Sequence, residues 1–130
     1  MIVVYNLKNE DHMSDENDFY IGRGSVLGNP YTHIKDRKTL ATFVVGSREE
    51  AIELYSDYFD KMYGSNKEFT KEIDEIYERY KTGKTVYLGC FCKPKSCHGD
   101  IIKQKLEKRL LKEKITAMRK NKENNGSGEI

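Results

Sequence analysis

The chain lacks the features that mark several large classes of protein. No run approaches the roughly 20 consecutive apolar residues that a membrane span needs, and the N-terminus shows no secretory signal pattern. The formal net charge is only +2, which is too small to indicate nucleic acid as a partner. No internal repeat is visible. We therefore expect a cytoplasmic protein, with neither a membrane nor a nucleic acid as its partner.

Cysteine is also scarce. The chain has three cysteines, Cys90, Cys92 and Cys97, and no secretory signal, which argues against a disulfide framework and for reduced thiols. Basic residues outnumber acidic ones from Lys103 to Lys122, a pattern that usually marks a solvated helix face. At 130 residues the chain is long enough to bury about two-thirds of its unfolded surface around one core.

Short apolar runs predict the strands. Two of them, Ile2–Asn6 and Thr85–Cys90, are typical of buried strands, and Phe19–Gly22 predicts another between them. Residues 40–45 fit either a further strand or an extended approach to the first long helix.

Apolar residues at helical spacing predict three helices. The first follows a capping box of Ser47 and Glu50, and the second follows a pair of the same kind, Ser65 and Glu68, and stops at Gly83. The third runs from about Gly99 to Met118. We expect residues 1–118 to form one ligand-binding domain and residues 119–130, which are polar and rich in Gly and Ser, to form a disordered tail.

The order of these elements predicts a small three-layer α/β domain with a largely parallel sheet. Two polar loops leave the ends of predicted strands. One loop spans Arg23 to Pro30, and the other spans Cys90 to Asp100. Because the carboxyl ends of parallel strands share one edge, where such folds bind ligands, we expect both loops to face a common cleft.

The first loop, Arg23-Gly-Ser-Val-Leu-Gly-Asn-Pro30, contains a candidate phosphate-binding set. Its glycines let a ligand approach the backbone closely, and a guanidinium suits a phosphate or a carboxylate. Turn formation alone also explains the glycines, and Arg23 has Asp100 as an alternative partner. The residues that we expect to bind a ligand here are Arg23, Gly24, Ser25, Gly28 and Asn29.

The second loop ends in Cys97-His98-Gly99-Asp100, at the predicted start of a helix. The first backbone N–H groups of a helix favour an anion, a histidine titrates near neutral pH, and an aspartate near a helix start stays ionised. All four residues are therefore candidates for ligand binding. His98 and Asp100 also suit acid–base catalysis, and Cys97, close to two lysines at a helix start, suits a nucleophile if the protein is an enzyme.

The cysteines have two further interpretations. Cys90, Cys92, Cys97 and His98 would make a Cys₃His zinc site, and alternation puts Cys90 and Cys92 on the same side, but the spacing lacks the usual C-x₂-C pair. Packing as small buried residues explains Cys90 and Cys92 more simply. We expect no metal and no cofactor.

Three segments together resemble a known family: Tyr20-Ile-Gly-Arg-Gly-Ser-Val-Leu-Gly-Asn-Pro-Tyr31, Ser47-Arg-Glu-Glu-Ala-Ile52 and Leu88-Gly-Cys-Phe-Cys-Lys-Pro-Lys-Ser-Cys-His-Gly-Asp100. This is the domain of unknown function 4326 family of bacteriophages and bacteria, and the resemblance spans roughly residues 2–111. It implies a compact Rossmann-like domain of phage or bacterial origin, located in the host cytoplasm if a phage encodes it, and brings no established reaction.

We expect the domain to bind a small phosphorylated nucleotide derivative, ADP-ribose-like or cyclic-nucleotide-like, between the two loops. A phage protein of this size would need only tight binding to sequester a host immune nucleotide signal. An N-glycosidase or nucleotide hydrolase acting on such a molecule is the alternative, and a zinc-stabilised interaction module is a third. The sequence does not reveal the identity of the ligand, whether the ligand is bound intact or cleaved, or whether the protein forms a homo-oligomer.

Overall fold

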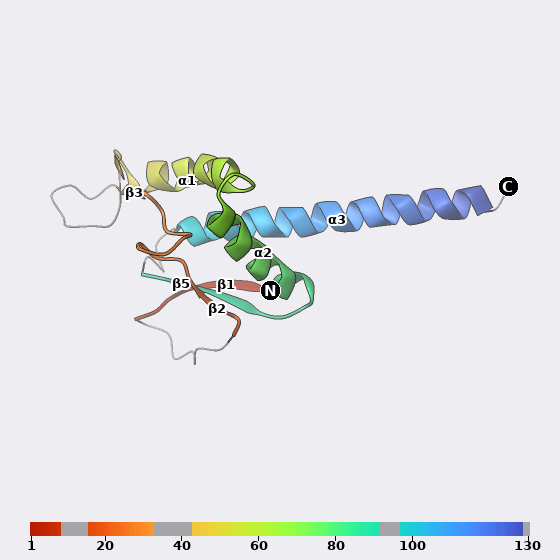
Figure 1. The fold of residues 1–130 in the computed structure, drawn as a ribbon, viewed down its shortest axis with the longest axis horizontal. Helices are drawn as coiled ribbons and strands as arrows, with labels where there is room; N and C mark the ends of the chain where they lie inside the picture. The colour runs from red at the N-terminus through yellow and green to blue at the C-terminus, as the bar shows by residue number, and fades with distance from the viewer. Residues whose placement is uncertain (9–15, 33–42, 92–96, 129–130) are drawn as a thin grey trace.

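The structure, a computed structural model, describes residues 1–8, 16–32, 43–91 and 97–128 (Figure 1). Within them the chain is mixed α/β, as the sequence predicts. The strands are β1 (Ile2–Asn6), β2 (Asp18–Tyr20), β3 (Tyr31–Thr32), β4 (Phe43–Val44) and β5 (Val86–Cys90). The helices are α1 (Arg48–Met62), α2 (Lys67–Lys81) and α3 (His98–Gly128).

The main sheet is fully parallel within the described residues. β5 lies between β1 and β2 and pairs with both of them, with Leu88 level with Val4 on one side and with Phe19 on the other. One bond continues each ladder past the strand ends: Leu7 N–H donates to Cys90 O at 2.9 Å, and Ile21 N–H donates to Gly89 O at 3.0 Å. All three strands therefore end at the same side, which we call the carboxyl edge.

One face of this sheet carries the core. Residues level with one another in a sheet point to the same side, so the core-facing side chains of the three strands gather on one face. α2 and α3 cover this face, as the buried cluster that joins strand and helix residues shows (Figure 1). The cluster includes Ile2, Phe19, Val86, Leu88 and Cys90 from the strands, with Ile73, Ile76, Ile102 and Leu106 from the helices.

The predicted cap of α1 is confirmed. Ser47 Oγ accepts the N–H of Glu50 at 3.1 Å, and Glu50 Oε2 accepts the N–H of Gly46 at 3.1 Å. The predicted cap of α2 is wrong by one residue. Asn66, not Ser65, is the N-cap, and its Oδ1 accepts the N–H of Phe69 at 2.9 Å. The Ser65 hydroxyl instead donates to carbonyl groups at the end of α1, so it is occupied there.

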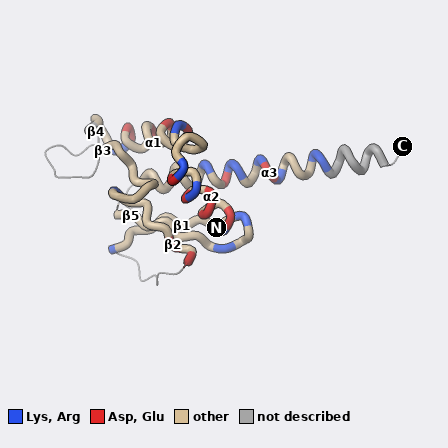
Figure 2. Tube along the Cα trace, viewed as in Figure 1, with Lys and Arg blue, Asp and Glu red and all other residues tan. Residues whose placement is uncertain are grey.

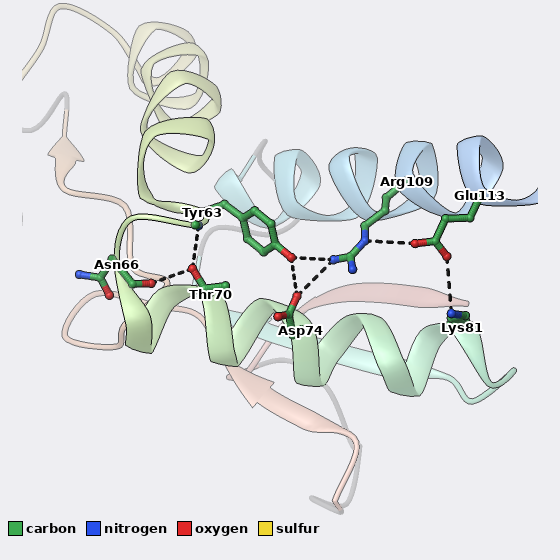
Figure 3. Close-up of polar contacts among 8 residues, drawn as sticks. Tyr63, Asn66, Thr70, Asp74, Lys81, Arg109 and Glu113 are labelled. Atoms are coloured by element: carbon green, nitrogen blue, oxygen red, sulfur yellow. Dashed lines mark hydrogen bonds and ion pairs between the residues drawn. The ribbon is translucent and has the colours of Figure 1, made fainter. Parts of the chain in front are cut away.

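The three helices meet at one polar cluster (Figure 3). Arg109 of α3 donates from Nη1 to Asp74 Oδ1 of α2 at 3.2 Å and to Tyr63 Oη, after α1, at 3.1 Å. Tyr63 in turn donates to Asp74 at 2.6 Å. The Arg109 guanidinium also lies 3.9 Å from the centre of the Tyr77 ring. Because the ion pair is partly exposed, it stabilises by at most about 1 kcal/mol, and its main effect is to fix how the helices pack.

α3 is longer than the helix predicted from the sequence. It continues to Gly128, past the predicted end at Met118 and through most of the predicted tail. No proline follows Pro94, and no glycine lies between Gly99 and Gly126, so the sequence contains no helix breaker there. α3 extends away from the sheet (Figure 1), and Lys and Arg lie at intervals along it as far as Lys120 (Figure 2). None of the helices in the described residues is long and apolar enough to cross a membrane.

Two smaller differences concern strands. The sequence expects a strand over Phe19–Gly22, whereas β2 covers Asp18–Tyr20 and the chain turns directly after it. Within the range 40–45, Phe43–Val44 form the strand β4, and residues 40–42 lie outside the described part. β4 pairs with β3, a strand that the sequence did not predict.

Candidate functional site

The two predicted loops approach each other at the carboxyl edge. The glycine loop, residues 22–30, follows β2, and Cys97–Asp100 begin α3. His98 Nε2 lies 2.6 Å from the carbonyl oxygen of Ile21, the residue just before the glycine loop. A carbonyl oxygen only accepts, so Nε2 carries the hydrogen and donates it. This bond connects the start of α3 to the start of the glycine loop.

The close packing between the start of α3 and the strands also requires a glycine at position 99. A Cβ atom on Gly99 would lie 2.7 Å from Ile21 Cδ1 and 2.8 Å from Val4 Cγ1, closer than carbon atoms tolerate. The absence of a side chain therefore lets α3 begin directly against β1 and the end of β2. Packing explains Gly99 without a ligand.

The glycine loop consists of two successive turns. Ser25 N–H donates to Gly22 O at 3.1 Å, and Gly28 N–H donates to Ser25 O at 3.0 Å. Gly24 has φ of 90°, which favours glycine, and the Ser25 hydroxyl donates to Gly22 O at 2.6 Å. A Cβ on Gly28 would lie 2.8 Å from Gly22 O, so the two turns are in contact. The loop is thus shaped by its own hydrogen bonds.

Arg23 and Asn29 stabilise this loop. Arg23 Nη1 donates to Asn29 O at 2.9 Å and to Tyr31 O at 3.3 Å, which brings the two ends of the loop together. Asn29 is buried, donates from Nδ2 to Ala51 O of α1 at 3.1 Å, and accepts the N–H of Tyr31 at 3.0 Å. The side chain of Asn29 therefore anchors the loop to α1.

Tyr55 connects α1 to both loops. Its hydroxyl donates to Leu27 O in the glycine loop at 2.7 Å, and its ring meets the His98 ring edge-on with centres 4.9 Å apart. Burial raises the pKa of Tyr55 well above its usual value, and the nearby Tyr58 and Cys97 raise it further. Tyr55 therefore remains a neutral hydrogen-bond donor at the centre of the site.

Cys97 and Cys90 are buried as free thiols, with their Sγ atoms 3.2 Å apart. Cys97 Sγ also lies 3.6 Å from His98 Nδ1 and accepts the N–H of Gly99 at 3.4 Å. Cys92 lies outside the described residues. Among the residues that are described, no group of three His, Cys, Asp or Glu side chains is arranged to hold a metal ion.

Asp100 closes the first turn of α3. Its Oδ2 accepts the N–H of Cys97 at 3.1 Å, and its own N–H donates to Cys97 O at 3.0 Å. A carboxylate here also faces the positive end of the helix dipole. Asp100 is half-buried, in contrast to Cys97 and His98, which are buried.

The predicted site residues thus form two groups joined through Ile21. Arg23 and Asn29 share a hydrogen bond in one group, while Cys97, His98 and Asp100 are hydrogen-bonded neighbours in the other. Of the nine predicted ligand-binding residues, Arg23, Gly24, Ser25, Gly28 and Asp100 are the ones with more than marginal exposure.

A family model for a domain of unknown function (DUF4326) matches residues 5–108, which include the end of β1, all of β2 and β5, and all residues of both loops. The chain belongs to this DUF4326 family. It is also 40% identical over 57 residues to the uncharacterized 12.4 kDa protein in the nrdA-td intergenic region of Enterobacteria phage T4. That alignment covers 44% of this chain and 46% of the phage protein. No solved structure matches the chain.

In this DUF4326 domain, three residues at the carboxyl edge were not predicted from the sequence. Leu7, Tyr20 and Phe91 are large apolar residues, and each is substantially exposed. Each stands at the end of one strand of the main sheet. The available signal for these residues was an apolar side chain directly before a polar loop. Their exposure could not be predicted, because the sequence does not reveal which face of the sheet the helices leave uncovered.

Proposed function

We propose that the protein binds a small phosphorylated nucleotide derivative at the carboxyl edge, between the glycine loop and the start of α3. The observation that carries this proposal is the 2.6 Å bond from His98 to the Ile21 carbonyl, because it brings the two loops to one edge. Parallel α/β sheets bind their ligands at this edge, and helix starts and glycine loops there suit phosphate groups. The parallel order of the sheet also supports a comparison with Rossmann-like domains, which is part of the same proposal. In the described residues the core and the helices lie on one face of the sheet, so the three-layer arrangement expected from the sequence is not part of it.

The residues divide into two roles in this proposal. Arg23, Gly24, Ser25 and Asp100 contact the ligand, since they are at least partly exposed. Arg23 and the glycine backbone meet phosphate oxygens, and the Asp100 carboxylate accepts from sugar hydroxyl groups. The buried members, Asn29, Cys97 and His98, together with Gly28 and Gly99, hold the two loops in place.

Burial favours binding over catalysis. His98 is 5% exposed and its two ring nitrogens face Ile21 O and Cys97 Sγ, while Cys97 is 1% exposed. Reactive cysteines are ordinarily partly exposed, and a general base must reach its substrate. Only Asp100 among the three candidate catalytic residues has the exposure that an N-glycosidase or nucleotide hydrolase would require.

The phage relative suggests a biological setting for such a binder. A small phage protein that holds a nucleotide derivative tightly lowers the free concentration of that molecule without any reaction. An ADP-ribose-like or cyclic-nucleotide-like signal of host immunity is the ligand class that we propose.

The test is to incubate the purified protein with a panel of nucleotides, release the bound molecule by heating, and identify it by chromatography. Recovery of the intact molecule supports a binder, whereas an altered product means an enzyme. Arg23→Gln and Asp100→Asn should each weaken binding about ten- to a hundredfold, the loss of one charge-assisted hydrogen bond.

Lys61→Gln is the matched control, because Lys61 is an exposed cation at the end of α1, away from the carboxyl edge. It should bind as the unmodified protein does. Asp100→Asn keeps an oxygen that can accept from Cys97 N–H, so its unfolding midpoint should change little. Full affinity in both Arg23→Gln and Asp100→Asn would place the ligand elsewhere and reject the proposal.

A further inference from the structure

The carboxyl edge carries three exposed apolar side chains, one from each strand of the main sheet. Leu7 follows β1 and is 37% exposed, Tyr20 ends β2 and is 45% exposed, and Phe91 follows β5 and is 53% exposed. Single exposed apolar residues are ordinary in soluble proteins, but contiguous ones at a ligand-binding edge often mark a contact surface. The three lie at the edge where the proposed ligand binds.

All three point to the face of the sheet opposite to the core. Tyr5, Gly89 and Tyr20 are level with one another in the sheet, and Leu7 and Phe91 lie two residues beyond Tyr5 and Gly89. Side chains two residues apart on a strand share a face. The buried Tyr5 and the half-buried Tyr87 lie on the same face, with their rings edge-on at 6.1 Å. We call Tyr5, Leu7, Tyr20, Tyr87 and Phe91 the aromatic face.

The Tyr20 ring is held in a fixed position at this edge. Its hydroxyl donates to Arg23 O at 3.0 Å, and the ring covers Gly22 so closely that a Cβ on Gly22 would lie 2.4 Å from Tyr20 Oη. Gly22 is thus a glycine because Tyr20 packs against it. The Phe91 ring meets Tyr20 edge-on with centres 6.2 Å apart. Two partly exposed rings are therefore in place without a ligand.

A cation stands beside the rings. Lys8 Nζ lies 5.9 Å from the centre of the Phe91 ring, and the glycine loop with Arg23 begins directly after Ile21. Aromatic side chains with nearby cations bind nucleobases by stacking, and fixed rings lose little entropy when they do so. An aliphatic ligand would use neither the ring geometry nor the cation.

We propose that Phe91 and Tyr20 bind the base of the nucleotide by stacking, so that the ligand class is one with a purine or pyrimidine ring rather than a sugar phosphate alone. This proposal rests on the proposed function and assigns the base to the aromatic face, with the phosphate end at the glycine loop. Lys8 lies beside the Phe91 ring, where its ammonium group would meet the electron-rich edge of the base.

The experiment compares AMP with ribose 5-phosphate, which lacks the base, and with adenosine, which lacks the phosphate. The full chain should bind AMP at least about tenfold more tightly than ribose 5-phosphate, the size of one stacking contact. The adenine H2 and H8 resonances should shift upfield on binding, because a ring current acts on a stacked base. Phe91→Ser should lose the AMP preference and the upfield shift while keeping its affinity for ribose 5-phosphate.

Two variants complete the design. Phe91→Tyr keeps a ring and should keep the shift, and Leu111→Ser removes a 59% exposed apolar residue from α3, past the sheet, and should behave as the unmodified protein. Equal affinity of the unmodified protein for AMP and ribose 5-phosphate would overturn the stacking proposal and leave the proposed function standing. An equal loss of both ligands in Phe91→Ser would also overturn it, because Phe91 would then only support the fold. Failure of AMP, adenosine and ribose 5-phosphate to bind at all would reject both proposals.

Discussion

The imidazole of His98 donates to the carbonyl oxygen of Ile21 across 2.6 Å, although the two residues are 77 positions apart in the chain. The bond joins the first residue of α3 to the residue that follows β2. Both ends are buried, so water does not replace this hydrogen bond when it is lost. The direct hydrogen bond between the two loops therefore depends on the His98 side chain.

His98→Ala should destabilise the fold by about 1–3 kcal/mol, because it leaves the buried Ile21 carbonyl without this donor. The free energy of unfolding from urea denaturation measures the change. Gln104→Ala, an exposed substitution on the same helix, should stay within about 0.5 kcal/mol. Equal stability of His98→Ala and the unmodified protein would mean that the bond contributes nothing to the fold.

Gly99→Ala should cost about 1–3 kcal/mol, since the added methyl group would overlap Ile21 Cδ1 and Val4 Cγ1. The double variant Gly99→Ala with Ile21→Val removes the Cδ1 atom and should recover part of that loss. Thermal unfolding of the single and double variants measures both effects. If the two substitutions simply add, the steric explanation of Gly99 is wrong.

Alkaline pH should unfold the protein through its buried tyrosines. Burial, followed by the nearby negative charge of Glu113, raises the pKa of Tyr77 to about 12. The folded state then holds the phenol proton more tightly than the unfolded chain, whose tyrosines titrate near about pH 10. The stabilisation is complete below that pH and is lost as pH rises through about 12. Denaturation midpoints measured from pH 9 upward should fall, and less steeply in Tyr77→Phe. An unchanged slope in that variant would contradict the assignment.

Protein purified without chelator should contain well under one zinc per chain by elemental analysis. The two described cysteines pack against each other, and the described residues provide no set of three metal-ligating side chains. A stoichiometric zinc that is lost together with folding in Cys97→Ala would establish a structural metal site instead.

The elements that depend on local chemistry were predictable from the sequence. The strand Ile2–Asn6, the cap of α1 by Ser47 and the stop of α2 at Gly83 follow from apolar runs, capping patterns and a glycine with φ of 92°. The cap of α2 was not, because Ser65 and Asn66 both carry a side-chain oxygen of the kind that accepts a helix N–H group. The Ser65 hydroxyl donates to carbonyl groups at the end of α1, and Asn66 therefore caps the helix.

The proximity of the two loops was predictable from the sequence, whereas the partners of their residues were not. The start of α3 does meet the start of the glycine loop at the carboxyl edge, yet Asn29 and His98 make hydrogen bonds to the backbone carbonyls of Ala51 and Ile21. A backbone carbonyl has no side-chain signature, so no pattern in the sequence reveals these partners. The exposure of Tyr20 and Phe91 was hidden for a related reason, since it depends on which face of the sheet α2 and α3 cover.

The position of β5 in the chain has a consequence for biosynthesis. β1 and β2 do not pair with each other, and each is hydrogen-bonded to β5, which begins at Val86. While the ribosome is still making α1 and α2, the first two strands of the main sheet have no neighbour in that sheet, and their apolar residues have no sheet to join. Such long-range pairing slows folding and leaves strand edges open to other chains. The central strand, made late, sets the moment at which the nascent chain can fold.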